Sequence, residues 1–427
     1  MKCSQRNVIG TPFPFMFGQI CNPIANLSAS RPYLAGMIPR HLAPKLRQLA
    51  QAFPVVTLTG PRQSGKSTLV REVFAGLPYV SLEDPDVRQL ALLDPRGFLT
   101  AYPQGAVFDE VQRVPALFSY LQGVVDRQPP PAAPYVLTGS QNFLLLEAIG
   151  QTLAGRTAVL RLLPLSCAEL HEAGQLPPTW DETLWRGGYP RLVQSALTPP
   201  DFYPSYTQTY LERDVRSITN ISDLSTFTRF LRLCAGRIAS PLNLSALAAD
   251  CGVAVNTAKA WVSVLEASYV LYLLPPHHAN YNKRLVKAPK LYFYDTGLAC
   301  SLLGIREAPQ VGTHYLRGGL FENLVLTEIL KHYDAQGRVA PVYFWQDKTG
   351  REVDFLLETP TGLLALEVKA SQTLNTDDFR QLTHWRGLSG SPAEQACVVN
   401  AGTLALPTAQ GAYVPLLELP AVLRAAG

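Results

Sequence analysis

A glycine-rich segment over residues 60–68 constrains the fold of this chain more than any other feature. It reads Gly-Pro-Arg-Gln-Ser-Gly-Lys-Ser-Thr, and Gly60 and Gly65 stand at the Walker A spacing, followed by Lys and Ser. An apolar run over 55–59 precedes the segment, and a helical pattern over 67–74 follows it. The pattern predicts a strand, a phosphate-binding loop and a helix within an α/β domain.

The residue types in this loop suit the binding of a nucleoside triphosphate. Glycines let backbone N–H groups curl around phosphate oxygens, and the start of the following helix adds positive potential. Lys66 would reach the β- and γ-phosphates, and the Ser67 hydroxyl would hold Mg²⁺. We therefore expect ATP and Mg²⁺ as cofactors. The residues expected to bind ATP are Gly60, Pro61, Arg62, Gln63, Ser64, Gly65, Lys66, Ser67 and Thr68.

Length and composition indicate a multidomain globular protein. The 427 residues are 47% hydrophobic and 16% charged, which excludes a disordered chain and favours about two to four domains. The net charge of +4 permits nucleic-acid binding without arguing for it. Seven cysteines without C-x-x-C spacing favour a reducing, cytoplasmic location over a disulfide framework. No apolar stretch reaches the ~18 residues that would span a membrane.

Residues 1–36 differ from the rest of the chain. They contain no Asp or Glu and show no clear periodicity, and they include several Pro, Asn and Ser residues. They also lack the long apolar region of a secretory signal. We expect a flexible extension here, or a natural translation start at Met37.

Residues 37–165 read as a nucleotide-binding domain. Short apolar strands are separated by helix-length segments, which implies a parallel sheet with helices on both faces. In such sheets the ligand binds at the carboxyl ends of the strands. The expected strands lie at 55–59, 79–82, 106–110, 135–140 and 158–162.

Acidic and polar residues at these strand ends complete a candidate hydrolytic site. Asp109 and Glu110 close an apolar strand, as in a Walker B motif. Asp109 would hold the Mg²⁺ shell, and Glu110 would polarise the attacking water. Ser140 ends another strand, expected between the Walker A and Walker B strands, where it would sense the γ-phosphate. Ser140 or Asn142 could also cap the next helix.

Three arginines are candidates for stabilising transition-state charge, in their own subunit or in a neighbouring one. Arg156 precedes the fifth strand, and Arg213 and Arg216 lie further along the chain. The residues alone do not choose among the three, and surface ion pairs are the alternative explanation. A role in trans would require a homo-oligomer.

Five short segments of the chain resemble the prokaryotic AAA-type P-loop ATPases. They are Thr59–Gln63, Leu137–Ser140, Leu153–Arg156, Arg186–Pro190 and Arg213–Asp214. The resemblance covers roughly residues 37–400 and points to the branch with a C-terminal domain of unknown function. It supports the architecture of the chain more than its biology.

Residues 166–225 read as a helical connector, and residues 226–300 read as a winged-helix domain. Two antiparallel strands would form the wing. Helices are expected at 227–238, 245–249 and 257–268, with a turn at Gly252, caps at Asn243 or Ser245 and at Asn256 or Thr257, and strands over 269–273 and 290–294.

The winged-helix region carries two possible contacts to nucleic acid. The third helix offers Lys259 and little else for base edges. A basic cluster before and in the wing could bind phosphates without sequence preference, it could be a solvated loop, or it could pair with the ATPase domain. The cluster consists of Lys283, Arg284, Lys287 and Lys290, with Tyr281 among them.

Residues 301–427 carry a second set of acidic residues. A helix is expected from 320 to about 333, followed by strands over 341–346, 351–358 and 363–369. If Glu358 and Leu363 flank the turn, Asp354 pairs with Glu367, and Lys369 shares their face. Because opposed carboxylates repel one another, this arrangement favours a cation between them, and Mg²⁺ suits such oxygen ligands.

This constellation resembles the PD-(D/E)xK nuclease pattern, which implies a restriction-endonuclease-like fold. By that resemblance Asp354, Glu367 and Glu322 would hold Mg²⁺. Lys369 would activate water or neutralise the scissile phosphate, and Gln346 would help to position these groups. Ordinary Glu–Lys salt bridges are the alternative explanation.

The combined prediction is an α/β protein with a P-loop parallel-sheet ATPase domain, a helical connector, a winged-helix domain and a restriction-endonuclease-like C-terminal domain. The leading hypothesis is a Mg²⁺-dependent ATPase whose cycle moves the winged helix and the nuclease-like domain on DNA or RNA. The alternative is a nucleotide-controlled switch or scaffold whose inactive nuclease-like domain binds proteins. A transcriptional regulator, based on the helix-turn-helix pattern alone, is a third hypothesis.

Overall fold

The structure is a computed structural model, and it describes residues 37–127, 135–140, 150–211, 224–277, 288–347 and 349–427. The predicted extension over 1–36 lies outside the described residues. The predicted helix cap Asn142 and the candidate arginines Arg213 and Arg216 also lie outside the described residues. The same holds for four residues of the predicted basic cluster: Tyr281, Lys283, Arg284 and Lys287.

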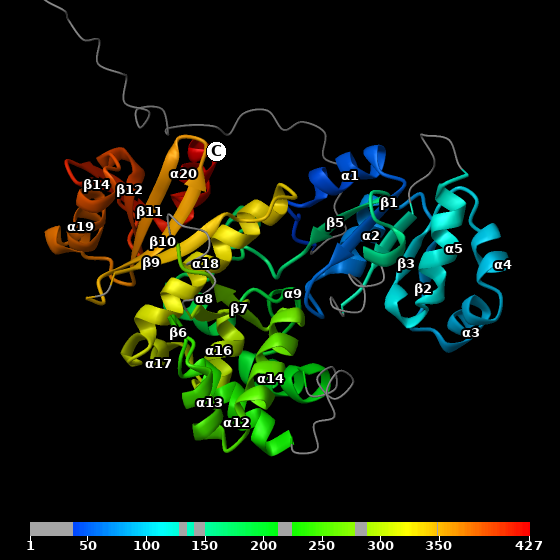
Figure 1. Cartoon of the computed structure of the whole chain (residues 1–427), viewed down its shortest axis with the longest axis horizontal. Helices are drawn as coiled ribbons and strands as arrows, with labels where there is room; N and C mark the ends of the chain where they lie inside the picture. The colour runs from blue at the N-terminus through cyan, green and yellow to red at the C-terminus, as the bar shows by residue number, and fades with distance from the viewer. Residues whose placement is uncertain (1–36, 128–134, 141–149, 212–223, 278–287, 348) are drawn as a thin grey trace, which may run out of the picture. The chain divides into compact units, whose positions relative to one another are not determined.

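The predicted five-stranded parallel sheet is confirmed, and its strand order is β2-β3-β4-β1-β5 (Figure 1). The strands are β1 (Val55–Thr59), β2 (Tyr79–Ser81), β3 (Val107–Asp109), β4 (Tyr135–Thr138) and β5 (Thr157–Arg161). The strand β4 lies between the strand that leads into the phosphate loop and the strand that ends at Asp109, as expected. The three candidate strand ends are therefore neighbours.

Helices cover both faces of this sheet, because alternate side chains of its strands point to opposite faces. On one face Phe108 and Leu137 pack with α3, α4 and α5, and on the other face Leu58 and Val136 pack with α1 and α2. Burying each such side chain contributes about 1.5–3 kcal/mol. The helices are α1 (Ala43–Ala52), α2 (Lys66–Val73), α3 (Pro85–Leu93), α4 (Pro95–Thr100) and α5 (Ala116–Val125).

The predicted connector is helical. It contains α7 (Cys167–Glu172), α8 (Trp180–Arg186), α9 (Pro190–Gln194), α10 (Pro199–Tyr206) and a π-helical turn at Thr207–Leu211.

The described residues of the next region form three helices and a small antiparallel sheet of order β6-β8-β7. Asn243 caps the second helix by accepting a hydrogen bond from the Ala246 N–H, and Gly252 ends that helix at φ +75°. The third helix starts earlier than predicted, so the expected caps at Asn256 or Thr257 are wrong. Ala254 precedes it without a side-chain cap. The elements are α12 (Leu224–Ala235), α13 (Leu244–Cys251), α14 (Val255–Ala267), β6 (Ser240–Pro241), β7 (Leu271–Leu274) and β8 (Lys290–Phe293).

The C-terminal region is a six-stranded mixed sheet of order β13-β14-β12-β11-β10-β9. The predicted hairpin register is confirmed, because Glu358 pairs with Leu363 in antiparallel β10 and β11. The strands are β9 (Val342–Gln346), β10 (Glu352–Thr359), β11 (Gly362–Lys369), β12 (Ala396–Asn400), β13 (Leu406–Thr408) and β14 (Gly411–Pro415). The helices are α16 (Thr296–Leu302), α17 (Ala308–Thr313), α18 (Arg317–Ala335), α19 (Arg380–Ser389) and α20 (Leu419–Ala426).

The connector, the middle region and the C-terminal region share one hydrophobic core. Its buried side chains run from Leu163 to Leu423 along the sequence, and they include residues of α12, α14, α18 and β11. The boundary that we expected between residues 300 and 301 falls inside α16. In the described part of the chain, no helix is both long enough and apolar enough to cross a membrane.

Candidate nucleotide site and a second acidic cluster

The loop between β1 and α2 has the backbone of a phosphate cradle. Gly60 and Gly65 have φ of +142° and +95°, and Gln63 also has a positive φ of +61°. A Cβ on Gly60 would lie 2.2 Å from the Leu162 carbonyl oxygen, so only glycine fits there. The Ser64 hydroxyl is buried without a hydrogen-bond partner among the described residues. A loop with this backbone conformation and an unpartnered buried hydroxyl is suited to binding an anionic ligand.

Asp109, at the end of β3, accepts hydrogen bonds from three hydroxyl groups. Its Oδ2 atom accepts a hydrogen bond from Ser67 Oγ at 2.8 Å and another from the Tyr79 hydroxyl. Its Oδ1 atom accepts from the Thr138 hydroxyl at the end of β4. Burial, followed by the contact with Asp109, raises the pKa of Tyr79. The structure thus brings Ser67 and Asp109 together, and their oxygens are hard ligands of the kind that Mg²⁺ prefers.

Glu110 and Ser140 are also brought together. Ser140 Oγ donates a hydrogen bond to Glu110 Oε2 at 3.1 Å, and Gln112 Nε2 donates to the same oxygen. Glu110 has φ +56° and ψ +43°, a left-handed conformation that is uncommon for residues other than glycine. Such strain often persists where a side chain must be aimed at a reaction.

Lys66 lies at the start of α2, close to the loop backbone. Its ammonium donates hydrogen bonds to the carbonyl oxygens of Gly60 and Pro61 at 2.9 and 2.8 Å. A cavity of about 630 Å³ opens beside the loop. Beyond loop residues, its lining consists of Glu83, Glu110, Pro190, Arg191, Gln194 and Ser195.

The cavity lining contains an arginine, Arg191, that is not among the arginines predicted from the sequence. Arg191 lies on α9, directly after the segment Arg186–Pro190 that carries part of the family resemblance. The Gly188 N–H donates to Asp295 Oδ2 at 2.8 Å, and this bond helps to fix where α9 begins. The adjacent family segment is the signal that could have pointed to Arg191.

The structure does not bring Arg156 to the phosphate loop. Arg156 precedes β5, and Thr157 pairs with Val55 at the start of parallel β1, so Arg156 lies at the opposite end of the sheet. Its guanidinium forms a two-point ion pair with Asp126, at 2.5 Å from Oδ1 and 3.0 Å from Oδ2. The expected role of Arg156 in its own subunit's site is therefore corrected to a surface ion pair.

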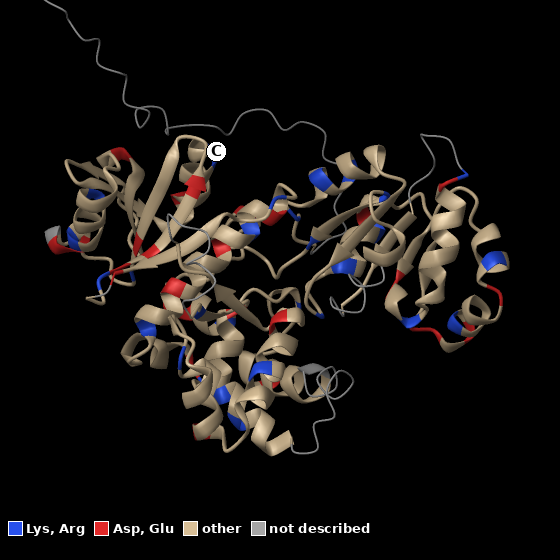
Figure 2. Ribbon diagram, in the orientation of Figure 1, with Lys and Arg blue, Asp and Glu red and all other residues tan. Residues whose placement is uncertain are grey.

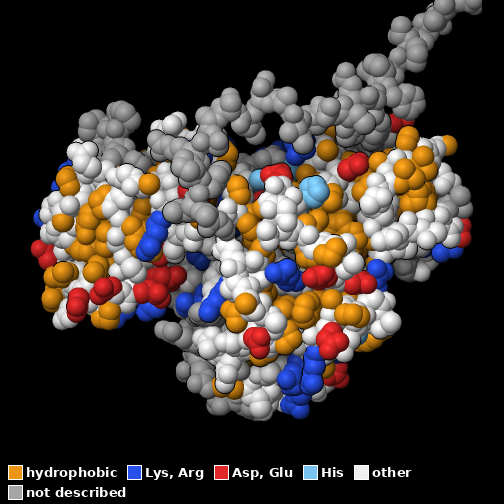
Figure 3. All heavy atoms as spheres, turned by 180° about the vertical axis from the view of Figure 1, so that it is seen from behind, with side chains coloured by type: hydrophobic (Ala, Val, Ile, Leu, Met, Phe, Trp, Pro, Cys, Tyr) orange, Lys and Arg blue, Asp and Glu red, His pale blue; other side chains and the backbone are white. Residues whose placement is uncertain are grey.

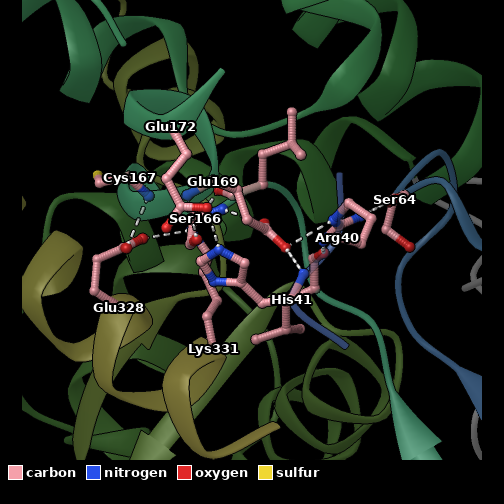
Figure 4. A network of polar contacts seen from close by, with 11 residues as sticks. Arg40, His41, Ser64, Ser166, Cys167, Glu169, Glu172, Glu328 and Lys331 are labelled. Atoms are coloured by element: carbon pink, nitrogen blue, oxygen red, sulfur yellow. Dashed lines mark hydrogen bonds and ion pairs between the residues drawn. The ribbon is translucent and has the colours of Figure 1, made fainter. Parts of the chain in front are cut away.

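A polar network connects the loop to more distant elements (Figure 4). Arg40 donates to the Ser64 carbonyl at 2.8 Å, to the Leu163 carbonyl at 2.7 Å and to Glu169 Oε1 at 3.1 Å. Burial would raise the pKa of Glu169, but the positive charge on Arg40 and the backbone donors outweigh burial and lower that pKa. No sequence pattern marks Arg40, because its partners come from three separate segments.

The network continues into the C-terminal region. Glu328 on α18 accepts from the Cys167 N–H at 2.8 Å, next to the Ser166 cap of α7 (Figure 4). Lys331 bridges Glu328 and the Leu165 carbonyl at 2.8 and 2.9 Å. A cavity of about 190 Å³ adjoins these residues. The phosphate loop is thus connected to α18 through buried and partly buried hydrogen bonds.

The second acidic cluster lies where α18 meets β10 and β11. Asp354 Oδ2 accepts a hydrogen bond from the Val368 N–H at 2.8 Å. Lys369 donates to Glu367 Oε1 at 2.7 Å, whereas Glu367 Oε2 is buried and has no hydrogen-bond partner among the described residues. Burial, and then the Asp354 carboxylate, raises the pKa of both Glu322 and Glu367.

Lys290 belongs to this cluster and not to a basic surface. Its side chain is only 1% exposed, and its ammonium lies 3.2 Å from Glu322 Oε1 and 3.3 Å from Glu352 Oε1. Burial would lower the pKa of Lys290, but the Glu322 and Asp354 carboxylates outweigh it and raise that pKa. The expected phosphate-binding role of Lys290 is therefore wrong. A lysine in an otherwise apolar strand was the signal for this burial.

Charges of both signs are spread over the described residues (Figure 2). On the face that Figure 3 shows, basic side chains lie beside acidic ones. Lys259 is exposed on α14, whereas Trp261 is buried in the core. Contact with nucleic acid would therefore rest on local sites rather than on a basic stripe across this face.

The parallel sheet and the loop between β1 and α2 are those of a P-loop nucleotide-binding domain. Residues 52–171 match the family described as AAA domain. Residues 178–308 and 317–419 match two domains of unknown function, DUF8612 and DUF4143.

The relatives define the family. The chain is 30% identical over 338 residues to the uncharacterized proteins Mb2031c of Mycobacterium bovis and Rv2008c of Mycobacterium tuberculosis, and the match covers 78% of this chain and 74% of each of them. The chain belongs to the same family as these two proteins. Among solved structures, the Walker-type ATPase paby2304 of Pyrococcus abyssi is 14% identical, with a TM-score of 0.41, over 62% of this chain and 96% of its own.

Proposed function

We propose that this protein hydrolyses ATP in a Mg²⁺-dependent reaction at the loop over residues 60–68. The observation that carries the proposal is the convergence of Ser67 and Asp109, whose side chains form a 2.8 Å hydrogen bond beside the loop. Ser67 and Asp109 would hold Mg²⁺, which would neutralise charge on the phosphates. The backbone of the loop would bind the phosphates, and Lys66 would exchange its carbonyl contacts for phosphate oxygens.

The remaining polar groups have distinct proposed roles. Glu110 accepts the proton of the attacking water or polarises it, and Ser140 orients Glu110 through their 3.1 Å hydrogen bond. Arg191 takes the place of Arg156 as the arginine that faces the phosphates, because it lines the cavity beside the loop. A positive charge at that position stabilises the charge that develops during phosphoryl transfer.

Phosphate release by the full chain tests this proposal. We expect ATP turnover with Mg²⁺, and we expect Lys66→Ala to abolish it. Arg96 is an exposed residue away from the loop, so Arg96→Ala is the matched control. Equal turnover by Lys66→Ala and the control would refute the proposal. Strong stimulation by DNA or RNA would favour action of the winged-helix region on nucleic acid, and no stimulation would favour the switch or scaffold alternative.

A second proposed function is metal-dependent cleavage of nucleic acid by the C-terminal region. The observation that favours it is Glu367 Oε2, a buried carboxylate oxygen without a hydrogen-bond partner among the described residues, in the electrostatic field of Asp354 and Glu322. These three carboxylates would hold Mg²⁺, which would polarise the scissile phosphate. Lys369, which is about one-third exposed at 34%, would face the substrate.

Cleavage of supercoiled and single-stranded DNA with Mg²⁺ or Mn²⁺ tests this second function. We expect Asp354→Ala to lose cleavage while it keeps ATP turnover, because the two sites use different residues. Equal cleavage by the wild type and Asp354→Ala would show that this cluster is not its source.

A further inference from the structure

The acidic cluster proposed as a metal site already contains a cation, the Lys290 ammonium. Lys290 is the first residue of β8, and it contacts Glu322 from α18 and Glu352 from β10. Tyr292, two residues further along β8, donates to the same Glu322 Oε1 atom at 2.5 Å. One strand of the middle region therefore presents an ammonium and a hydroxyl to the carboxylates of the C-terminal region.

Lys290 and a divalent cation would compete for Glu322, and the Lys290 ammonium also interacts electrostatically with Asp354. A buried ammonium neutralises the negative charge that would otherwise attract a metal ion, and two cations at such short range repel each other. Glu322 Oε1 is engaged by two donors at once, so it is not presented as a metal ligand. Over the described residues, no three His, Cys, Asp or Glu side chains are grouped as a metal site. The contacts of Lys290 and Tyr292 with Glu322 are those expected of a site that its own lysine keeps closed.

We propose that Lys290 is a displaceable counter-cation, and that a divalent cation binds Glu322, Asp354 and Glu367 only when Lys290 withdraws. The inference rests on the metal site proposed above and adds its regulation. Replacing one cation by another keeps the carboxylates neutralised, so the cluster can exist in two states.

The strand that carries Lys290 is also connected to the phosphate loop. Tyr294, the residue directly after β8, accepts a hydrogen bond from Arg161 at the end of β5, at 3.2 Å. The Tyr294 ring packs edge-on against Tyr269 at 5.6 Å between centroids. The Tyr269 hydroxyl lies 2.9 Å from Thr59 Oγ1, one residue before Gly60. These contacts connect Thr59, next to the phosphate loop, through Tyr269 and Tyr294 to the strand that carries Lys290.

Mn²⁺ binding to the full chain, measured by electron paramagnetic resonance of the free ion, tests the inference. Ser67→Ala serves as the parent, so that the phosphate loop does not contribute. We expect Lys290→Gln to tighten Mn²⁺ binding about tenfold, and Glu352→Gln to tighten it in the same direction because it loosens the hold on Lys290. Glu352 is 35% exposed, so its variant tests the idea even if Lys290→Gln does not fold. Adding Asp354→Asn should remove the gain.

The outcomes separate the two proposals. Tighter Mn²⁺ binding that depends on Asp354 supports the counter-cation. A second outcome is Mn²⁺ binding that depends on Asp354 but is no tighter in Lys290→Gln and Glu352→Gln than in the parent. That outcome overturns the role of Lys290 as a counter-cation and leaves the proposed metal site intact. If no variant binds Mn²⁺ through Asp354, the metal site itself is overturned, and the counter-cation with it.

Discussion

Replacing Arg40 by methionine should destabilise the fold and weaken ATP binding together. Arg40 donates three hydrogen bonds, and its side chain is 9% exposed while that of Glu169 is 5% exposed. Removing one partner of a buried ion pair costs about 3–5 kcal/mol. Glu169 keeps backbone donors from His41 and Ser166, at 2.7 and 2.9 Å. We therefore expect the low end of the range, about 3 kcal/mol.

The assay is denaturant unfolding of the full chain, with Arg96→Met as the matched control. An exposed arginine without such contacts should change the free energy of unfolding by about 0.5 kcal/mol or less. The KM for ATP should rise in Arg40→Met, because the Ser64 carbonyl in the phosphate loop loses its donor. If Arg40→Met matches the control in both the free energy of unfolding and KM, Arg40 does not support the loop.

Three further predictions follow from particular contacts. Arg191→Ala should lower kcat for ATP by about 100-fold, whereas Arg156→Ala should leave kcat unchanged; the opposite result in phosphate release would restore Arg156. Gly187→Ala should lower the free energy of unfolding by about 1–3 kcal/mol, because its Cβ would lie 2.2 Å from the Tyr203 hydroxyl; an unchanged denaturation midpoint would contradict this clash. Burial and two nearby arginines lower the pKa of His332 from 6.5 to about 4. The folded state therefore binds fewer protons than the unfolded state in this range, and stability is lost as pH falls from 6.5 towards 4. His332→Gln should weaken this fall in Tm, and an identical pH profile would contradict the assignment.

The sequence predicted the elements that depend on local pattern. All five strands of the first sheet are confirmed in position, because each is a short apolar run between helical segments. The hairpin register is confirmed from Glu358 and Leu363, because a short turn fixes the pairing of its strands. The Walker motifs predict Ser67 and Asp109 at one site, and the structure brings them to 2.8 Å of each other. The contacts of Asp109 with Tyr79 and Thr138 were not predicted.

The contacts that the sequence could not supply join distant segments. Arg40 and Glu169 are separated by 129 residues, and Lys290 and Glu352 by 62. The basic residues that precede Lys290 along the chain suggest a phosphate-binding cluster, whereas the Lys290 side chain is only 1% exposed. The position of Arg156 next to a strand suggests a place near the nucleotide, but Arg156 adjoins the end of that strand that lies away from the loop. The direction of β5 decides the position of Arg156, and the packing of α18 and β10 against β8 decides that of Lys290.

ATP binding and turnover by Glu110→Gln test the central claim most directly. The amide keeps the size of the side chain and removes the charge that would polarise water, while the loop and Asp109 are untouched. We predict that Glu110→Gln binds ATP as the wild type does and loses turnover by about 100-fold or more. Turnover equal to that of the wild type, at equal ATP binding, would contradict hydrolysis by this site.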